Sequence, residues 1–161
     1  MDLAYTANGP VYMRMGKADR GDVHANALAP LQPGRLLCLR AGQADRPALI
    51  ATGSMVRTAF DIARLGFDAA VWSAPSIKPL SADDVCAVAK ASRGLVTLEE
   101  HSVLGGLGSA VAEIVSERHP TRVLRIGVRD RFSEYCGTHA YLLREHGLDR
   151  ESVQAQIALP A

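Results

Sequence analysis

The sequence of 161 residues has almost no excess charge, few cysteines and no long apolar run. A formal net charge of +1 provides no general electrostatic attraction to nucleic acid or to an anionic membrane. No run reaches the roughly 18 apolar residues of a membrane span, and the Met-Asp start does not resemble a signal peptide. Cys38, Cys86 and Cys136 are odd in number and far apart, which favours reduced thiols. We therefore expect a cytoplasmic protein with neither a nucleic-acid nor a membrane partner.

Signatures of hydrolytic and metal-dependent catalysis are also missing. No serine lies in a Gly-x-Ser-x-Gly elbow. Four histidines have no second ligand at a metal-binding spacing, and we interpret them as surface residues: His24, His119, His139 and His146. The sequence thus predicts no catalytic residue and no metal site in this chain.

What the sequence does contain is a regular alternation of short apolar runs and helical patterns. Buried strands are predicted at residues 48–51, 69–72, 95–98 and 123–127. Helices are predicted between them, the first from about Met55 to Leu65, with Ser54 and Ser81 as N-caps. Two more follow the last strand, at residues 138–145 and 150–158. This order predicts a three-layer α/β/α fold with a mostly parallel sheet of about five strands.

Residues 1–46 lack this regular pattern. An extended stretch follows the Gly9-Pro10 turn signal, and residues 29–34 have the composition of a linker. Residues 35–40 form a candidate edge strand. We therefore divide the chain into a leading segment, residues 1–46, and a domain, residues 47–161.

The polar group Glu99, Glu100 and His101 is predicted to form a loop after the third strand, at the edge of the sheet where ligands and partners usually bind. Adjacent residues on a strand point to opposite faces, so the two glutamates are not expected to act on one atom. One glutamate is a candidate to cap backbone amides, while the other meets a partner. His101 is the best single candidate for a reactive side chain; the alternative is a hydrogen-bonded structural histidine.

Two further groups follow at the same edge. Gly105, Gly106 and Gly108 precede a helix and suggest a phosphate-binding turn, but they match neither a P-loop nor a dinucleotide fingerprint. The alternative is that these glycines let the backbone pass close to a neighbouring element. Asp130 is surrounded by Arg125, Arg129 and Arg131. We interpret this group as a salt-linked surface loop, an anion site or an interface.

Five segments, taken in order, resemble the C-terminal domain of transketolase-type thiamine diphosphate enzymes. The likeness is closest to the C-terminal subunit of split transketolases, with 1-deoxyxylulose-5-phosphate synthase next. It spans residues 9–158 and is carried by residues 48–54, 77–80, 96–101, 105–111 and 125–132. The resemblance implies that residues 1–46 are the tail of a preceding pyrimidine-binding domain followed by a linker.

The resemblance also implies what is missing. In the family, the arginine that matches Arg14 helps to hold the phosphate of the sugar substrate. Diphosphate and magnesium are bound by Gly-Asp-Gly and a later asparagine, whereas this chain has only Arg20-Gly21-Asp22-Val23. The glutamate that activates the cofactor belongs to a domain that this sequence does not contain. We therefore expect no cofactor on this chain alone, and thiamine diphosphate with magnesium in the assembled enzyme.

The resemblance predicts a C-terminal component for two-carbon ketol transfer between sugar phosphates, with a structural and dimerisation role and no activity alone. Its expected partners are the missing thiamine-binding domains or N-terminal subunit, and a second copy of itself. The interface is predicted around residues 99–109 and 129–132, where opposite charges meet across a two-fold axis. Three alternatives stay open: a non-catalytic module like the C-terminal domain of a 2-oxo acid dehydrogenase β subunit, a synthase fragment, and a nucleotide-binding regulator using residues 105–109.

Overall fold

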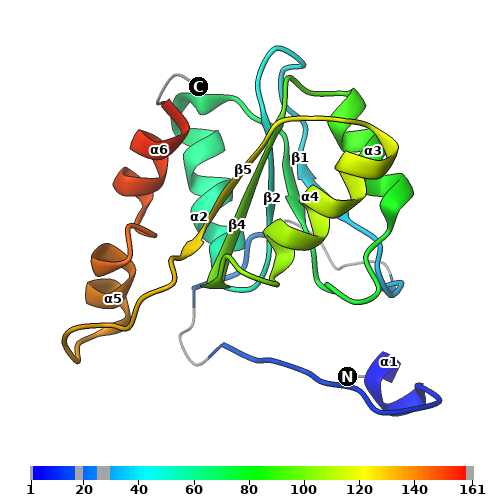
Figure 1. The fold of residues 1–161 in the computed structure, drawn as a ribbon, viewed down its shortest axis with the longest axis horizontal. Helices are drawn as coiled ribbons and strands as arrows, with labels where there is room; N and C mark the ends of the chain where they lie inside the picture. Colours follow the sequence, from blue (N-terminus) through cyan, green and yellow to red (C-terminus); the bar gives the residue numbers. More distant parts are fainter. Residues whose placement is uncertain (1, 17–19, 25–29, 159–161) are drawn as a thin grey trace.

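The computed structural model describes residues 2–16, 20–24 and 30–158, and its centre is a twisted sheet (Figure 1). The strands in spatial order are β1 (Leu37–Arg40), β3 (Val71–Ser73), β2 (Ala48–Ala51), β4 (Leu95–Ser102) and β5 (Val123–Val128). β2 to β5 run parallel to one another, and β1 pairs antiparallel with β3 at the edge. The predicted mostly parallel sheet of about five strands is confirmed.

Helices cover both faces of the sheet and give three layers. α3 (Ala82–Lys90) and α4 (Leu107–Arg118) lie on one face, and α2 (Met55–Ile62) and α6 (Arg150–Ala158) lie on the other (Figure 1). α5 (His139–Glu145) precedes α6. The Ser81 hydroxyl accepts a hydrogen bond from the Asp84 amide at 3.1 Å, so the predicted cap of α3 is confirmed.

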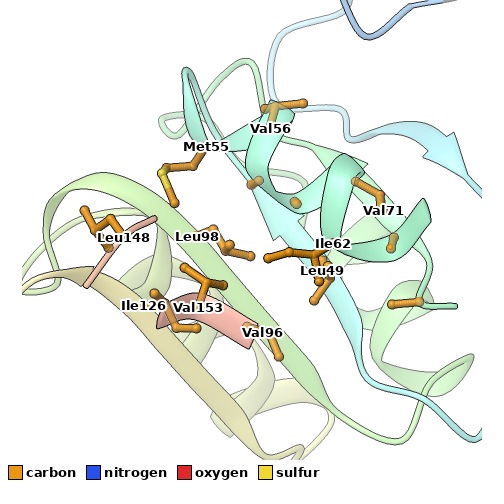
Figure 2. Close-up of a cluster of buried hydrophobic side chains, with 14 of the residues drawn as sticks. Leu49, Met55, Val56, Ile62, Val71, Val96, Leu98, Ile126, Leu148 and Val153 are labelled. Carbon is orange, nitrogen blue, oxygen red and sulfur yellow. The ribbon is translucent and has the colours of Figure 1, made fainter. Parts of the chain in front are cut away.

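The central strands are apolar on both sides because both of their faces are covered. Along β2, Leu49 and Ala51 belong to the core beneath α2 and α6, whereas Ala48 and Ile50 belong to the core beneath α3 and α4. Figure 2 shows Leu49 and Leu98 of neighbouring strands in the first of these cores, which also contains Val153 of α6. The alternating direction of strand side chains thus lets one short run of four apolar residues build two cores.

The helix predicted from Met55 to Leu65 ends earlier than expected. α2 ends at Ile62 and is followed by one π-helical turn, Ala63–Phe67, in which Gly66 has a φ of +117°. Asp68 then adopts a left-handed conformation, with a φ of 55°, and its carboxylate accepts a hydrogen bond from Arg40 of β1. The edge strand therefore holds the end of this helix in place.

The N-terminal segment begins with a short helix, α1 (Asp2–Thr6), which the sequence did not predict, and continues as an exposed extended stretch (Figure 1). Residues 20–24 return to the domain, where Arg20 donates a hydrogen bond to Thr58 Oγ1 at 3.1 Å. Part of the predicted linker, residues 25–29, lies outside the described residues. β1 lies before the boundary drawn between residues 46 and 47, and it pairs with β3, which lies after it. The sheet therefore includes strands from both sides of that boundary.

Candidate functional site

The polar group that the sequence placed in a loop belongs to a strand. β4 runs from Leu95 to Ser102 and therefore includes Glu99, Glu100 and His101. Its end pairs with β5 through Ser102 and Val128, after an irregular register beyond Leu98. The expectation of a loop was wrong because the strand continues through these residues and resumes its pairing with β5 at Ser102. The strand directs their side chains into different surroundings.

Glu99 is buried, with 1% of its surface exposed, and caps α4 from inside the domain. Its two carboxylate oxygens accept hydrogen bonds from the Leu107 and Gly108 amides, both at 2.8 Å. The N-cap residue of α4, Gly106, has no side chain, and the first turn of the helix contains no acidic residue. A carboxylate at this position satisfies two amides and interacts favourably with the helix dipole. Glu99 therefore has the first of the two roles considered for the glutamates, the capping of backbone amides.

The glycine turn is shaped by this carboxylate. A Cβ atom on Gly106 would lie 1.9 Å from Glu99 Oε2, and one on Gly108 would lie 2.7 Å from Thr97 Oγ1. Gly105 has a φ of +78°, a conformation that favours glycine. Since Glu99 binds the amides that a phosphate would need, the structure does not support a nucleotide-binding regulator at residues 105–109. The glycines permit close approach of backbone to side chain within the chain.

Glu100 links four segments of the molecule. Ser54, in the turn between β2 and α2, donates a hydrogen bond to its Oε2, and His139 Nε2 lies 2.9 Å from the same atom. Arg14, in the N-terminal segment, donates from Nη1 to the Glu100 carbonyl oxygen at 3.1 Å. Ser54 occupies the predicted N-cap position of α2, but its hydroxyl makes no cap hydrogen bond and donates to Glu100 instead. His139 is half-buried by the same contact and is not an isolated surface residue.

The acid–base behaviour of Glu100 follows from these contacts. Burial opposes ionisation of the carboxyl group, but hydrogen bonds from Ser54 and His139 and the positive charges of His139 and Arg14 outweigh it. The pKa of Glu100 therefore lies below its ordinary value of 4.5. Its contacts stabilise the fold at pH values above the ordinary pKa and are lost as the pH falls through the lowered one.

We expect Glu100→Gln to reduce the loss of stability in acid. Asp68, Asp84 and Asp149 also have lowered pKa values, so acid destabilises both proteins, but the variant loses one contribution fewer. The measurement is the urea midpoint of both proteins between about pH 7 and 3. The wild type should be the more stable at neutral pH, with the difference narrowing in acid. A constant difference at all pH values would contradict the assignment. Glu113→Gln, at an exposed carboxyl group, is the control.

A pocket of about 350 Å³ lies between the end of β5 and α5. Glu100 and Arg131 both line this pocket, together with Phe132 and His146. Arg131 donates to the Glu145 carbonyl oxygen at 2.5 Å, while Arg129 and Asp130 are exposed. His101 is exposed beside Ser102, and its Nδ1 lies 3.5 Å from that residue's carbonyl oxygen. The structure thus brings Glu100 and Arg131 together and leaves His101 apart.

Arg125 differs from the other two arginines because it points back into the domain. Its Nη1 donates to the Val103 carbonyl oxygen at 3.1 Å and to Ser109 Oγ at 3.2 Å, so it ties the glycine turn to β5.

Among residues 2–16, 20–24 and 30–158, no group of three or more His, Cys, Asp or Glu side chains could hold a metal ion. No helix in the same ranges is long and apolar enough to cross a membrane. These residues thus provide a cap, a linking carboxylate and an exposed polar edge.

Comparison with known proteins identifies this architecture. The family model described as transketolase, C-terminal domain, matches residues 38–153. The chain belongs to this family. A split-gene transketolase, solved as an inactive β4 tetramer, matches this transketolase-type domain with a TM-score of 0.86 and 35% identity. The match covers 97% of this chain and 50% of that one.

Individual relatives agree with the family assignment. One of the subunits of the apulose-4-phosphate transketolase of Actinobacillus succinogenes is 31% identical, over 95% of this chain and 50% of that protein. The putative transketolase C-terminal section of Methanocaldococcus jannaschii is 32% identical, over 92% of this chain and 47% of that protein. The 1-deoxy-D-xylulose-5-phosphate synthase of Chlorobium phaeovibrioides is 35% identical, over 98% of this chain and 26% of that protein. This transketolase C-terminal domain thus spans about half of its transketolase relatives and a quarter of the synthase.

Proposed function

We propose that this chain is the C-terminal component of a transketolase-like enzyme that transfers a two-carbon ketol unit between sugar phosphates in the cytoplasm. The proposal rests on one observation, the alignment of nearly the whole chain with half of a transketolase subunit and of a split-gene transketolase. The chain would act by building the subunit interface and supporting the active site, and it would be inactive alone. Its partners would be the thiamine-binding domains or N-terminal subunit, and a second copy of itself.

The residues present do not fit thiamine diphosphate and magnesium. The segment that comes nearest to the diphosphate motif is Arg20-Gly21-Asp22-Val23, and the Asp22 carboxylate accepts a hydrogen bond from the His24 amide at 2.8 Å. The described residues also contain no cluster of three metal ligands. We therefore derive no chemical step through this cofactor on the present chain and assign the cofactor to the assembled enzyme, where it would supply the carbanion chemistry.

Arg14 is the residue of this chain that we propose to contact substrate, through the phosphate of the sugar. A guanidinium group matches a phosphate because it presents several N–H donors in a planar fork. One donor of Arg14, Nη1, bonds to the Glu100 carbonyl oxygen, and the side chain is exposed. The transketolase-type domain would thereby orient an arginine that serves an active site completed by other domains.

A second candidate function is a part of a 1-deoxyxylulose-5-phosphate synthase. The similarity to the Chlorobium phaeovibrioides synthase favours it, since 98% of this chain aligns at 35% identity. The chain covers only 26% of that protein, against 50% of the transketolase subunit. Assays of ketol transfer between a sugar phosphate donor and acceptor, and separately of 1-deoxyxylulose 5-phosphate formation, distinguish the two activities.

Reconstitution tests the proposed function. The purified chain is mixed with a transketolase N-terminal subunit that binds thiamine diphosphate, preferably from the same source, and ketol transfer is measured with and without cofactor. We expect transfer by the mixture in the presence of cofactor and none by either component alone. Titration of the chain alone with thiamine diphosphate and magnesium, in phosphate buffer, should show no magnesium-dependent binding. Micromolar binding by the chain alone, or a mixture that forms a complex without transfer, would contradict the assignment.

A further inference from the structure

A serine and a histidine lie side by side at the pocket between the end of β5 and α5. Ser133 belongs to the loop that joins these two elements, and His146 directly follows the last residue of α5 (Figure 1). The Nε2 atom of His146 lies 2.8 Å from Ser133 Oγ, and both residues line the pocket. A hydroxyl within hydrogen-bond distance of an imidazole is the arrangement in which a histidine acts as general base for a serine nucleophile.

The end of α5 fixes the position of His146. Its backbone amide donates to the Leu142 carbonyl oxygen at 3.0 Å, and Leu148, two residues later, is buried in the core. His146 is half-buried and is not an isolated surface residue, as the sequence suggested. Its Nδ1 is enclosed by the protein, while its Nε2 is directed at the serine. The ring therefore offers only one nitrogen to the pocket.

Two buried polar atoms of residues 145 and 146 lack partners. Among the described residues, three buried side-chain nitrogen or oxygen atoms have no hydrogen-bond partner, and two of them are His146 Nδ1 and Glu145 Oε2. The other carboxylate oxygen of Glu145 accepts a hydrogen bond from the Glu134 amide at 2.9 Å. Unpaired buried polar groups are costly, and a catalytic role is one explanation for them. A carboxylate on the neighbouring residue suits a base that becomes positively charged when it takes a proton.

The other walls of the pocket are mainly apolar and suit a short hydrocarbon chain. They are formed by Val128, Leu142, Leu143 and Leu148, with Phe132 at the rim. Arg131 also lines the pocket, and its side chain is 41% exposed. Its Nη2 donates to the Glu145 carbonyl oxygen, which leaves further N–H groups of the guanidinium fork to meet an oxygen that becomes negatively charged.

From this geometry we propose that Ser133 and His146 form a catalytic pair that hydrolyses esters with a short apolar acyl chain. Ser133 Oγ forms a bond to the carbonyl carbon, and its proton moves to His146 Nε2. The bond from that carbon to the alcohol oxygen then breaks, and the alcohol leaves with this proton. A water molecule next attacks the acyl carbon and gives a proton to His146, which returns it to Ser133 Oγ as the carboxylic acid is released. This activity is separate from ketol transfer and does not rest on the proposed function.

The test is hydrolysis of p-nitrophenyl acetate and p-nitrophenyl butyrate, followed by the release of p-nitrophenolate. Every protein carries Cys136→Ala, because this exposed thiol lies three residues from Ser133 and would itself react with the esters. We expect saturable hydrolysis that is more efficient with butyrate than with acetate, because the walls are apolar. Mass spectrometry of the quenched reaction should find the acyl group on Ser133. Release that does not saturate, or acylation of lysines alone, would overturn the proposal.

Matched variants show whether the pair is responsible. Ser133→Ala should abolish the saturable hydrolysis, and His146→Gln should lower kcat about a hundredfold, as loss of a general base does. Glu145→Gln should lower kcat with little change in KM, since this carboxylate acts through the imidazole and does not contact the ester. Ser116→Ala is the control, because Ser116 is an exposed serine of α4 whose hydroxyl donates to the Glu113 carbonyl oxygen and not to a histidine. Circular dichroism checks that each variant is folded. Equal activity of Ser133→Ala and Ser116→Ala would refute the site, whether or not the chain serves ketol transfer.

Discussion

Replacing Glu99 by alanine is expected to lower the free energy of unfolding by about 3 kcal/mol, because two charge-assisted hydrogen bonds are lost and two buried amides remain without a partner. Both carboxylate oxygens bond to α4 amides at 2.8 Å, and the side chain is 1% exposed, so water does not replace it readily. Glu99→Gln should cost less, since the amide oxygen still accepts one of the two bonds. Urea unfolding followed by circular dichroism measures all three proteins.

Glu113→Ala is the matched control because Glu113 lies on the exposed side of the same helix. It should change stability by no more than about 0.5 kcal/mol. Gly106→Ala adds a second test, since the new Cβ atom would lie 1.9 Å from Glu99 Oε2. The double variant Glu99→Ala/Gly106→Ala should lose less than the sum of the single losses, because removal of the carboxylate removes the main clash. Strict additivity, or a Glu99→Ala protein as stable as the wild type, would show that the cap does not hold α4.

The sheet could be predicted from the sequence because its signals are local. Runs such as 48–51 and 95–98 are short, apolar and separated by helical patterns, and both form strands of the parallel sheet. Ser81 caps α3 through an amide three residues away, so its role also follows from neighbouring residues. The family resemblance added the identity of the domain, which the family model over residues 38–153 confirms.

The polar edge could be predicted only in part because its partners are distant in the sequence. Glu100 meets Ser54 46 residues before it and His139 39 residues after it, and no local pattern predicts these pairs. The glycine turn suggested either a phosphate or close backbone approach, and the choice depended on where Glu99 points. β4 passes beyond Leu98 because β5 continues beside it, which periodicity within one strand does not reveal. Nonlocal pairing therefore decided each point that the sequence left open.

Self-association remains a prediction, and the structure makes Phe132 its sharpest test. Phe132 is 95% exposed, and Arg129 and Asp130 beside it are exposed as well. Leu104, on the turn before α4, is 58% exposed at the same polar edge. A buried aromatic anchor surrounded by polar residues is typical of protein interfaces. Glu99 now belongs to the cap of α4, so the charge available for pairing with Arg129 of a second copy is Glu100 or Asp130.

Phe132→Ala is expected to weaken self-association at least about tenfold, in line with the loss of an aromatic anchor, and to leave folding unchanged because the ring contributes little to the core. Sedimentation velocity over a dilution series gives the dissociation constant, and thermal unfolding checks the fold. Leu65→Ala is the control, since Leu65 is 55% exposed and lies in the turn after α2, away from this edge.

Arg129→Glu should weaken association more at low salt than at high salt, because screening diminishes the repulsion that the new carboxylate introduces. A wild-type chain that stays monomeric at high concentration, and gains no mass when mixed with the thiamine-binding subunit, would rule out this interface. Equal association by Phe132→Ala and Leu65→Ala would place the contact elsewhere on the domain.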